Sequence, residues 1–178
     1  MLEIRQESVA IVACHATSGA LRELEKRLGK GEYSASNGFW IAPDELWRVE
    51  VVQQESALVR RCEEVLATIE PATLVVDASD GWALFRFRDE EKAERVGSRR
   101  LLALVSQLME IALPETRPFF LQCAFADVPG KLLSTDAGLD LFVPSPFADF
   151  VARRIRDVAD PVTTRLVLRK PPSGESAS

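Results

Sequence analysis

The only histidine of the chain, His15, directly follows Cys14, and the two side chains could form a thiol–imidazole pair or bind a metal. Residues 8–14 (SVAIVAC) have the composition of a short buried strand. Adjacent residues of a strand point to opposite faces of the sheet, so these two side chains cannot reach one centre. The sequence has no further Cys/His cluster at a spacing typical of metal ligands. We therefore expect a structural or surface histidine and no metal site.

A second candidate site lies at the junction between two predicted strands, where Asp77, Asp80 and Trp82 occur close together. Carboxylates and an indole at such a junction could contact a ligand, and these three residues are our candidates for cofactor binding. Asp, Ser and Gly are also the residues that a tight turn requires. We favour the tight turn, and cofactor binding stays open as the alternative.

The sequence offers no catalytic motif. The nine glycines are scattered and match neither the dinucleotide-binding nor the P-loop spacing. No serine lies in a G-x-S-x-G motif, and only His15 could activate a serine as an imidazole base. Carboxylate catalysis is open in principle, but the abundance of Asp and Glu identifies no residue. We assign no catalytic residue and favour a protein that is not an enzyme on its own.

The composition limits the classes of partner and the compartment. The net charge of −5 argues against nucleic acid or an anionic membrane as the main partner. The N-terminal residues lack the apolar region of a signal peptide, and no apolar run approaches the roughly 20 residues of a membrane-spanning helix. The three cysteines lie far apart, which favours reduced, buried thiols over a disulfide framework. We expect a cytoplasmic protein.

The first half of the chain predicts the order strand–helix–strand–strand–helix–strand. Strand 8–14 precedes a helix that begins at Ser18, where leucines recur at helical spacing. A hairpin over 38–51 follows, then a helix over 56–69 and a strand over 72–77.

The second half repeats this order. Its expected elements are a strand over 81–88, a charged helix that Asp89 caps and Gly97 interrupts, with helical spacing that continues from Leu101 to Ala112, a strand over 119–126, a turn-rich connection over 127–138, a strand over 139–143, a helix that begins at Ser145 and Pro146, and a strand over 162–169. Phe147, Val151, Ile155 and Val158 have helical spacing and are expected to face inward.

Two successive βαββαβ units predict an α+β fold of two tandem ferredoxin-like units with mainly antiparallel sheets. We place the first unit at residues 1–78, the second at 79–170 and a disordered tail at 171–178. Two small units are more stable when they share a core, so we expect the sheets to pack together.

The hairpin GFWIAPDELWRVEV (38–51) places Trp40 and Trp47 on neighbouring strands around a turn at Pro43. The two tryptophans are either an aromatic ligand site or structural side chains, and we favour the structural role, in which they pack on or beside one another. Trp47 and Val49 alternate with Arg48 and Glu50, which predicts one buried and one solvated face.

Three segments, in this order, resemble the γ subunit of heterotetrameric sarcosine oxidase. They are WIAPDELW (40–47), VVDASDGWALFRFRDEEKAERV (75–96) and LDLFVPSPFADFVARRI (139–155). The resemblance implies membership of the aminomethyltransferase (glycine cleavage T-protein) superfamily, whose folate-binding domain is a duplicated ferredoxin-like arrangement. It also implies a γ-like subunit that is itself non-catalytic and assembles with larger subunits that hold the cofactors.

These observations support two functional hypotheses. The first is a non-catalytic, sarcosine oxidase γ-like subunit or scaffold that associates with a larger oxidoreductase or one-carbon (folate) enzyme, or forms a homo-oligomer. The alternative is a small aminomethyltransferase-like protein that binds tetrahydrofolate, with Asp77, Asp80 and Trp82 at the rim of its pocket. Tetrahydrofolate is the cofactor that the resemblance implies.

Overall fold

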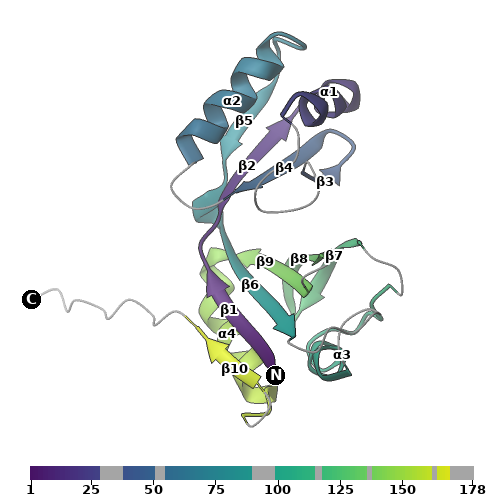
Figure 1. Cartoon of the computed structure of the whole chain (residues 1–178), viewed down its shortest axis with the longest axis vertical. Coiled ribbons are helices and arrows are strands. Elements are labelled where there is room, and N and C mark those ends of the chain that lie inside the picture. The colour runs from purple at the N-terminus through teal and green to yellow at the C-terminus, as the bar shows by residue number, and fades with distance from the viewer. Residues whose placement is uncertain are drawn as a thin grey trace, which may run out of the picture. The chain divides into compact units, whose positions relative to one another are not determined.

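The computed structural model describes residues 1–28, 38–50, 55–89, 99–114, 118–135, 138–161 and 164–168 (Figure 1). Ten strands in two sheets and four α-helices lie within these residues, which confirms the predicted mixed α+β fold with its ferredoxin-like duplication. The chain divides into two compact units, Ser8–Trp82 and Met1–Glu7 with Ala83–Ser178. None of the described helices is long and apolar enough to cross a membrane.

The unit Ser8–Trp82 is a single ferredoxin-like fold. Its elements are β2 (Ala10–His15), α1 (Ser18–Leu28), β3 (Phe39–Ala42), β4 (Glu45–Glu50), α2 (Glu55–Ala67), β5 (Leu74–Asp77) and the short 3₁₀ helix η1 (Ser79–Gly81). The sheet order is β3-β4-β2-β5, and every pairing is antiparallel. This is the βαββαβ order that the hydrophobic pattern predicted.

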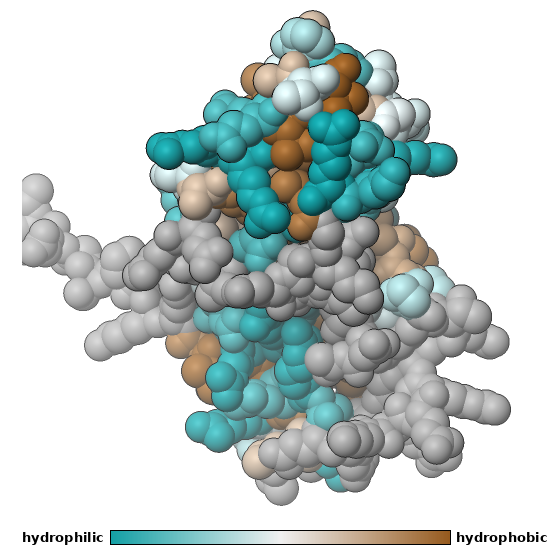
Figure 2. All heavy atoms as spheres, turned by 45° about the horizontal axis from the view of Figure 1, so that its top comes forward, coloured by the Kyte–Doolittle hydropathy of each residue, from teal (hydrophilic) through white to brown (hydrophobic). Residues whose placement is uncertain are grey.

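Helices α1 and α2 cover one face of this sheet because both are amphipathic. Leucines at three- and four-residue spacing bury one side of α1, and Leu58, Cys62 and Leu66 do the same in α2. Both sets pack on Val12, Cys14 and Leu46 of the sheet. The opposite sides of the helices are hydrophilic, and Figure 2 shows an apolar band between hydrophilic side chains on this unit.

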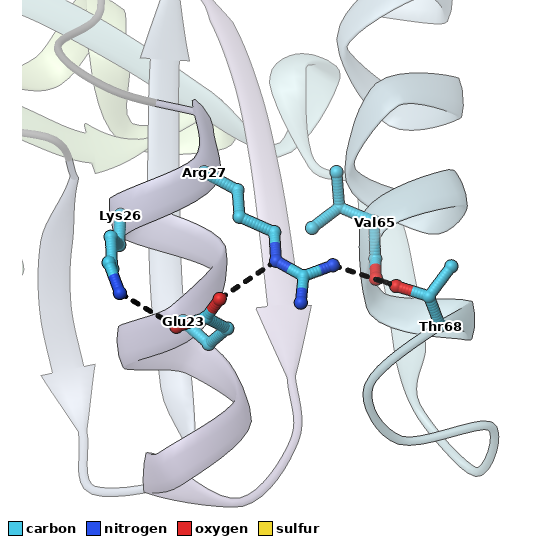
Figure 3. A network of polar contacts seen from close by, with 5 residues as sticks. All are labelled: Glu23, Lys26, Arg27, Val65 and Thr68. Carbon is cyan, nitrogen blue, oxygen red and sulfur yellow. Dashed lines mark hydrogen bonds and ion pairs between the residues drawn. The ribbon is translucent and has the colours of Figure 1, made fainter.

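Polar contacts join α1 to the C-terminal end of α2 (Figure 3). The Arg27 side chain donates from Nε to Glu23 Oε1 (2.8 Å) and from Nη1 to Thr68 Oγ1 (3.0 Å). Thr68 in turn donates to the carbonyl of Val65 (2.7 Å), and Lys26 lies 3.8 Å from Glu23. Because these side chains are exposed, their pairs add little to stability and mainly fix how the helices meet.

The other unit has a six-stranded sheet in the order β10-β1-β6-β9-β8-β7. Its elements are β1 (Leu2–Glu7), β6 (Trp82–Asp89), α3 (Arg99–Ser106), β7 (Phe120–Phe125), β8 (Val128–Thr135), β9 (Gly138–Pro144), η2 (Ser145–Phe147), α4 (Ala148–Val158) and β10 (Thr164–Val167). Without β1 and β7, the order β10-β6-β9-β8 is again ferredoxin-like. The N-terminal strand β1 is inserted between the first and last strands, antiparallel to β6 and parallel to β10.

Several sequence-based boundaries differ from the structure. Residues 1–7 lie in the sheet of the unit that contains Ala83–Ser178, rather than with the residues up to 78. Residues 128–135 form strand β8, which pairs with β7 and β9, in place of the expected turn-rich connection. Asp89 is the last residue of β6, and the start of the expected helix after it lies outside the described residues, whereas α3 ends at Ser106, before Ala112. The expected tail at 171–178 and Gly97 lie outside the described residues.

Helix α4 follows the predicted pattern with one exception. Val151 and Ile155 are buried in the core of this unit, and Val158 packs against it, as expected. Phe147 was expected to face inward but is 46% exposed, because Ser145–Phe147 form a 3₁₀ turn and the α-helix begins only at Ala148. Phe150, one turn further on, is also exposed.

An ion pair joins the neighbouring strands β6 and β9 of this unit where their backbones lie close together. Asp140 on β9 is buried, and its Oδ1 lies 2.7 Å from Nη2 of Arg88 on β6. A Cβ atom placed on Gly138 would lie 2.0 Å from the carbonyl oxygen of Phe87, and Gly138 has φ +149°. Only glycine fits this position, because a side chain would meet the backbone of β6.

Candidate functional site

The junction between β5 and β6 is a hydrogen-bonded turn built on Asp77. Its Oδ1 accepts from the Ser79 hydroxyl (2.6 Å) and from the Ser79 backbone N–H (3.0 Å). Bonds from an aspartate to the backbone two residues on are typical of an Asx turn. The Asp77 carboxylate therefore has the structural role that favoured the tight-turn interpretation.

Backbone contacts with β2 anchor the same turn. The N–H of Ile11 donates to Ser79 Oγ (2.9 Å), and the N–H of Ala78 donates to the Ile11 carbonyl (2.8 Å). The Ser79 hydroxyl oxygen thus accepts from the Ile11 N–H, a donor of β2 that lies just beyond the end of β5. Asp80 follows in η1, where it is exposed.

Trp82 leaves this turn and meets Trp47. The two ring centroids are 4.8 Å apart with an interplanar angle of 68°, an edge-to-face arrangement. Trp47 is 3% exposed, and its indole N–H donates to Glu45 Oε1 (2.6 Å). The structure thus places Asp77 against Ser79 and Trp82 against Trp47. Cofactor binding by Asp77, Asp80 and Trp82 stays a prediction.

The hairpin separates Trp40 from Trp47, contrary to the expectation that they pack on or beside one another. Residues 43–44 form the predicted turn, and Phe39, rather than Trp40, lies opposite Trp47. Trp40 therefore points to the helix-covered face, where it packs on the core and its N–H donates to Glu25 Oε2 (3.0 Å). Residues directly opposite each other on paired strands point to the same face, and successive residues point to opposite faces. Trp40, which follows Phe39, therefore lies on the face opposite to Trp47.

The expected solvated face of β4 is also buried. Arg48 is 3% exposed and Glu50 is 8% exposed, with Arg48 Nη2 3.5 Å from Glu50 Oε1. Alternation of polar and apolar residues predicted the strand correctly, but it assigned the polar face to solvent. Arg48 shares its face with Leu46, which packs against the helices, and so its charge is buried beneath them.

Two cysteines lie in the apolar core between the helices and the sheet. Cys14 on β2 and Cys62 on α2 are free, buried thiols in one apolar cluster. A hydrogen bond to Cys62, together with burial, raises the pKa of the Cys14 thiol, whereas the bond from Cys14, aided by the nearby Arg48, lowers the pKa of Cys62. Within the described ranges, no three His, Cys, Asp or Glu side chains gather in a way that could hold a metal ion.

Comparison with known proteins identifies the fold. No protein-family model matches the chain, and no curated protein is detectably similar in sequence. Among solved structures, a chain of the heterotetrameric sarcosine oxidase from Corynebacterium sp. U-96, in complex with pyrrole 2-carboxylate, has a TM-score of 0.65 and 14% sequence identity. The match covers 88% of this chain and 83% of that chain.

Two further solved structures match with lower scores. A protein from Agobacterium tumefaciens has a TM-score of 0.43, with 14% identity over 96% of this chain and 95% of that one. Aspartate kinase from Synechocystis has a TM-score of 0.42, with 12% identity over 96% of this chain and 27% of that one. The similarity to the sarcosine oxidase chain is therefore the comparison that supports the fold.

Proposed function

We propose that this protein is a non-catalytic, sarcosine oxidase γ-like subunit or scaffold that assembles with a larger oxidoreductase or one-carbon (folate) enzyme. The observation that carries the proposal is the structural match to a chain of a heterotetrameric enzyme over 88% of this chain and 83% of that one. Since both coverages are high, the two chains are similar in length, and the match extends over both ferredoxin-like units. A cytoplasmic location goes with this proposal.

The three segments that resemble the γ subunit support the same proposal. Segment 40–47 spans the hairpin of β3 and β4, the described part of 75–96 spans β5 to β6, and 139–155 spans β9 to α4. In two of them a polar residue forms a hydrogen bond within the fold, which agrees with a structural role. Asp77 holds a turn, and Glu45 accepts from Trp47.

The third segment also carries a surface suited to a protein partner. Phe147 and Phe150 are 46% and 38% exposed and lie one helical turn apart at the start of α4. Exposed aromatic side chains lose unfavourable contact with water when they enter an interface, and aromatic residues dominate interface energetics. We place the contact with the larger subunit here.

Affinity purification of the tagged chain from its native cells tests the proposal. We expect one larger oxidoreductase or folate-enzyme subunit in fixed ratio to the tagged chain. The variant Phe147→Asp/Phe150→Asp should lose this partner, while Leu102→Asp, an exposed residue on α3, should retain it. Recovery of the tagged chain without such a subunit would contradict the proposal.

A thermal-shift titration separates this proposal from the tetrahydrofolate-binding alternative. A ligand that binds the folded state raises the melting temperature once its concentration exceeds Kd. For a non-catalytic subunit we expect no shift with tetrahydrofolate. A concentration-dependent rise that Asp80→Ala abolishes would favour the folate-binding alternative. Asp77 is unsuitable for this test because its loss would open the turn.

A further inference from the structure

Strand β5 forms one edge of the four-stranded sheet and presents apolar side chains to solvent. It pairs with β2 on one side, and among the described residues no strand pairs with its other side. Leu74 is 58% exposed and Val76 is 39% exposed, while Val75 between them packs against the helix-covered core. An edge with exposed apolar side chains is a template for pairing with another strand, and the one charged residue of β5, Asp77, lies at its end.

The register between β5 and β2 determines which backbone groups of β5 point away from the sheet. The N–H of Ala78 donates to the Ile11 carbonyl (2.8 Å), and the same antiparallel register pairs Ala13 with Val76. In an antiparallel ladder, residues that exchange hydrogen bonds alternate with residues that turn their backbone groups away. Val76 and Leu74 therefore bond to β2, whereas Val75 directs its N–H and C=O outward.

Two other sheet edges carry residues that oppose strand addition. They are β3, at the other edge of the same sheet, and β10, at an edge of the six-stranded sheet. Strand β3 is followed at once by Pro43. On β10, Arg165 is 66% exposed and lies 3.8 Å from Glu3. Charged residues and prolines at an edge oppose strand addition, and β5 has neither between Leu74 and Val76.

We propose that β5 is a homodimerisation edge, which pairs antiparallel with β5 of a second copy about a two-fold axis at Val75. Val75 then exchanges both backbone hydrogen bonds with Val75 of the second copy. Leu74 lies opposite Val76 of the second copy on one face, and Thr73 lies opposite Asp77 on the other. The result is a continuous eight-stranded sheet, since each copy contributes four strands.

We infer a second copy of this chain as the partner because β5 is complementary to itself in this register. The two-fold register matches apolar with apolar side chains twice, through Leu74 and Val76. It also keeps the two Asp77 carboxylates apart and places each beside a threonine hydroxyl. A shift of one residue would instead pair Leu74 with Asp77. It would also pair Val75, whose backbone N–H and C=O point outward, with Val76, whose backbone groups already bond to β2. This inference does not depend on the proposed subunit role, which uses a surface on α4.

Charge substitutions on β5 test both the edge and its register. In Leu74→Lys/Val76→Lys, the proposed register brings four lysines together, so the dimer Kd should rise by at least about tenfold. In Leu74→Lys/Val76→Glu, each lysine lies opposite a glutamate, so dimerisation should be largely restored. Val167→Lys on β10, at a position 42% exposed, is the matched control and should dimerise like the wild type.

Sedimentation velocity from micromolar to millimolar concentration measures the outcome, with circular dichroism to confirm that each variant is folded. We expect the wild-type mass to shift from 19.7 kDa toward twice that value, and amide exchange at Val75 to slow as dimer forms. A wild type that stays at 19.7 kDa throughout would overturn the proposal. So would equal dimerisation of the lysine–lysine variant, or failure of the lysine–glutamate variant to recover.

Discussion

Replacement of Trp47 by alanine should destabilise the protein by about 3–5 kcal/mol, the range measured for large aromatic residues in cores. The side chain is 3% exposed, its N–H donates to Glu45, and its ring meets Trp82 edge-to-face at 4.8 Å. About 0.5–1.5 kcal/mol of the total should belong to the contact between the two rings. The remainder comes from the lost apolar burial and the cavity left behind.

Urea unfolding followed by far-UV circular dichroism measures this change, with the slope m compared between variants to confirm that only stability has changed. A double-mutant cycle with Trp82→Leu and Trp47→Leu isolates the ring contact, because leucine removes the aromatic ring while keeping part of the apolar burial. Trp40→Ala is a useful comparison, since that indole lies on the other face of the sheet. A loss below about 1 kcal/mol for Trp47→Ala would show that the indole is not buried as described.

Three further substitutions or conditions give distinct expected outcomes. Gly138→Ala should cost at least about 2 kcal/mol in urea unfolding, because its Cβ would lie 2.0 Å from the Phe87 carbonyl oxygen; near-neutral stability would contradict this close approach. Arg88→Ala should cost about 3 kcal/mol because it leaves buried Asp140 without its cation, and Arg88→Met/Asp140→Leu should cost less. Burial raises the pKa of Cys123 from 9.0 to about 11, so the folded state binds the proton more tightly. This contribution is complete below pH 9 and is lost between pH 9 and 11, at up to about 1.4 kcal/mol per pH unit, and Cys123→Ala should reduce the slope of stability against pH there.

The hairpin shows what the sequence could and could not predict about the candidate site. The turn at residues 43–44 follows from its proline and aspartate, and alternation in β4 predicts a strand. Alternation does not reveal whether both faces will be covered, so the burial of Arg48 and Glu50 was missed. The contact between Trp47 and Trp82 joins residues far apart in sequence and depends on tertiary packing.

The six-stranded sheet illustrates a second limit. Strand β1 alternates Leu2 and Ile4 with charged residues, and this period-two pattern could have predicted a strand. Its place between β6 and β10 is a long-range pairing that no local pattern specifies. Strand β8 contains Pro129 and Gly130, which read as a turn, yet the strand keeps its pairing with β7 through both residues. Tertiary pairing overrode the local signal there.

The central claim is that this chain works as a subunit of a larger enzyme. The most direct measurement is the mass and composition of the complex that contains the endogenous chain, purified under native conditions and analysed by native mass spectrometry. We predict a mass well above both the 19.7 kDa monomer and its dimer, with a larger oxidoreductase or folate-enzyme subunit in fixed ratio. Recovery of the chain only as monomer or homodimer would contradict the claim.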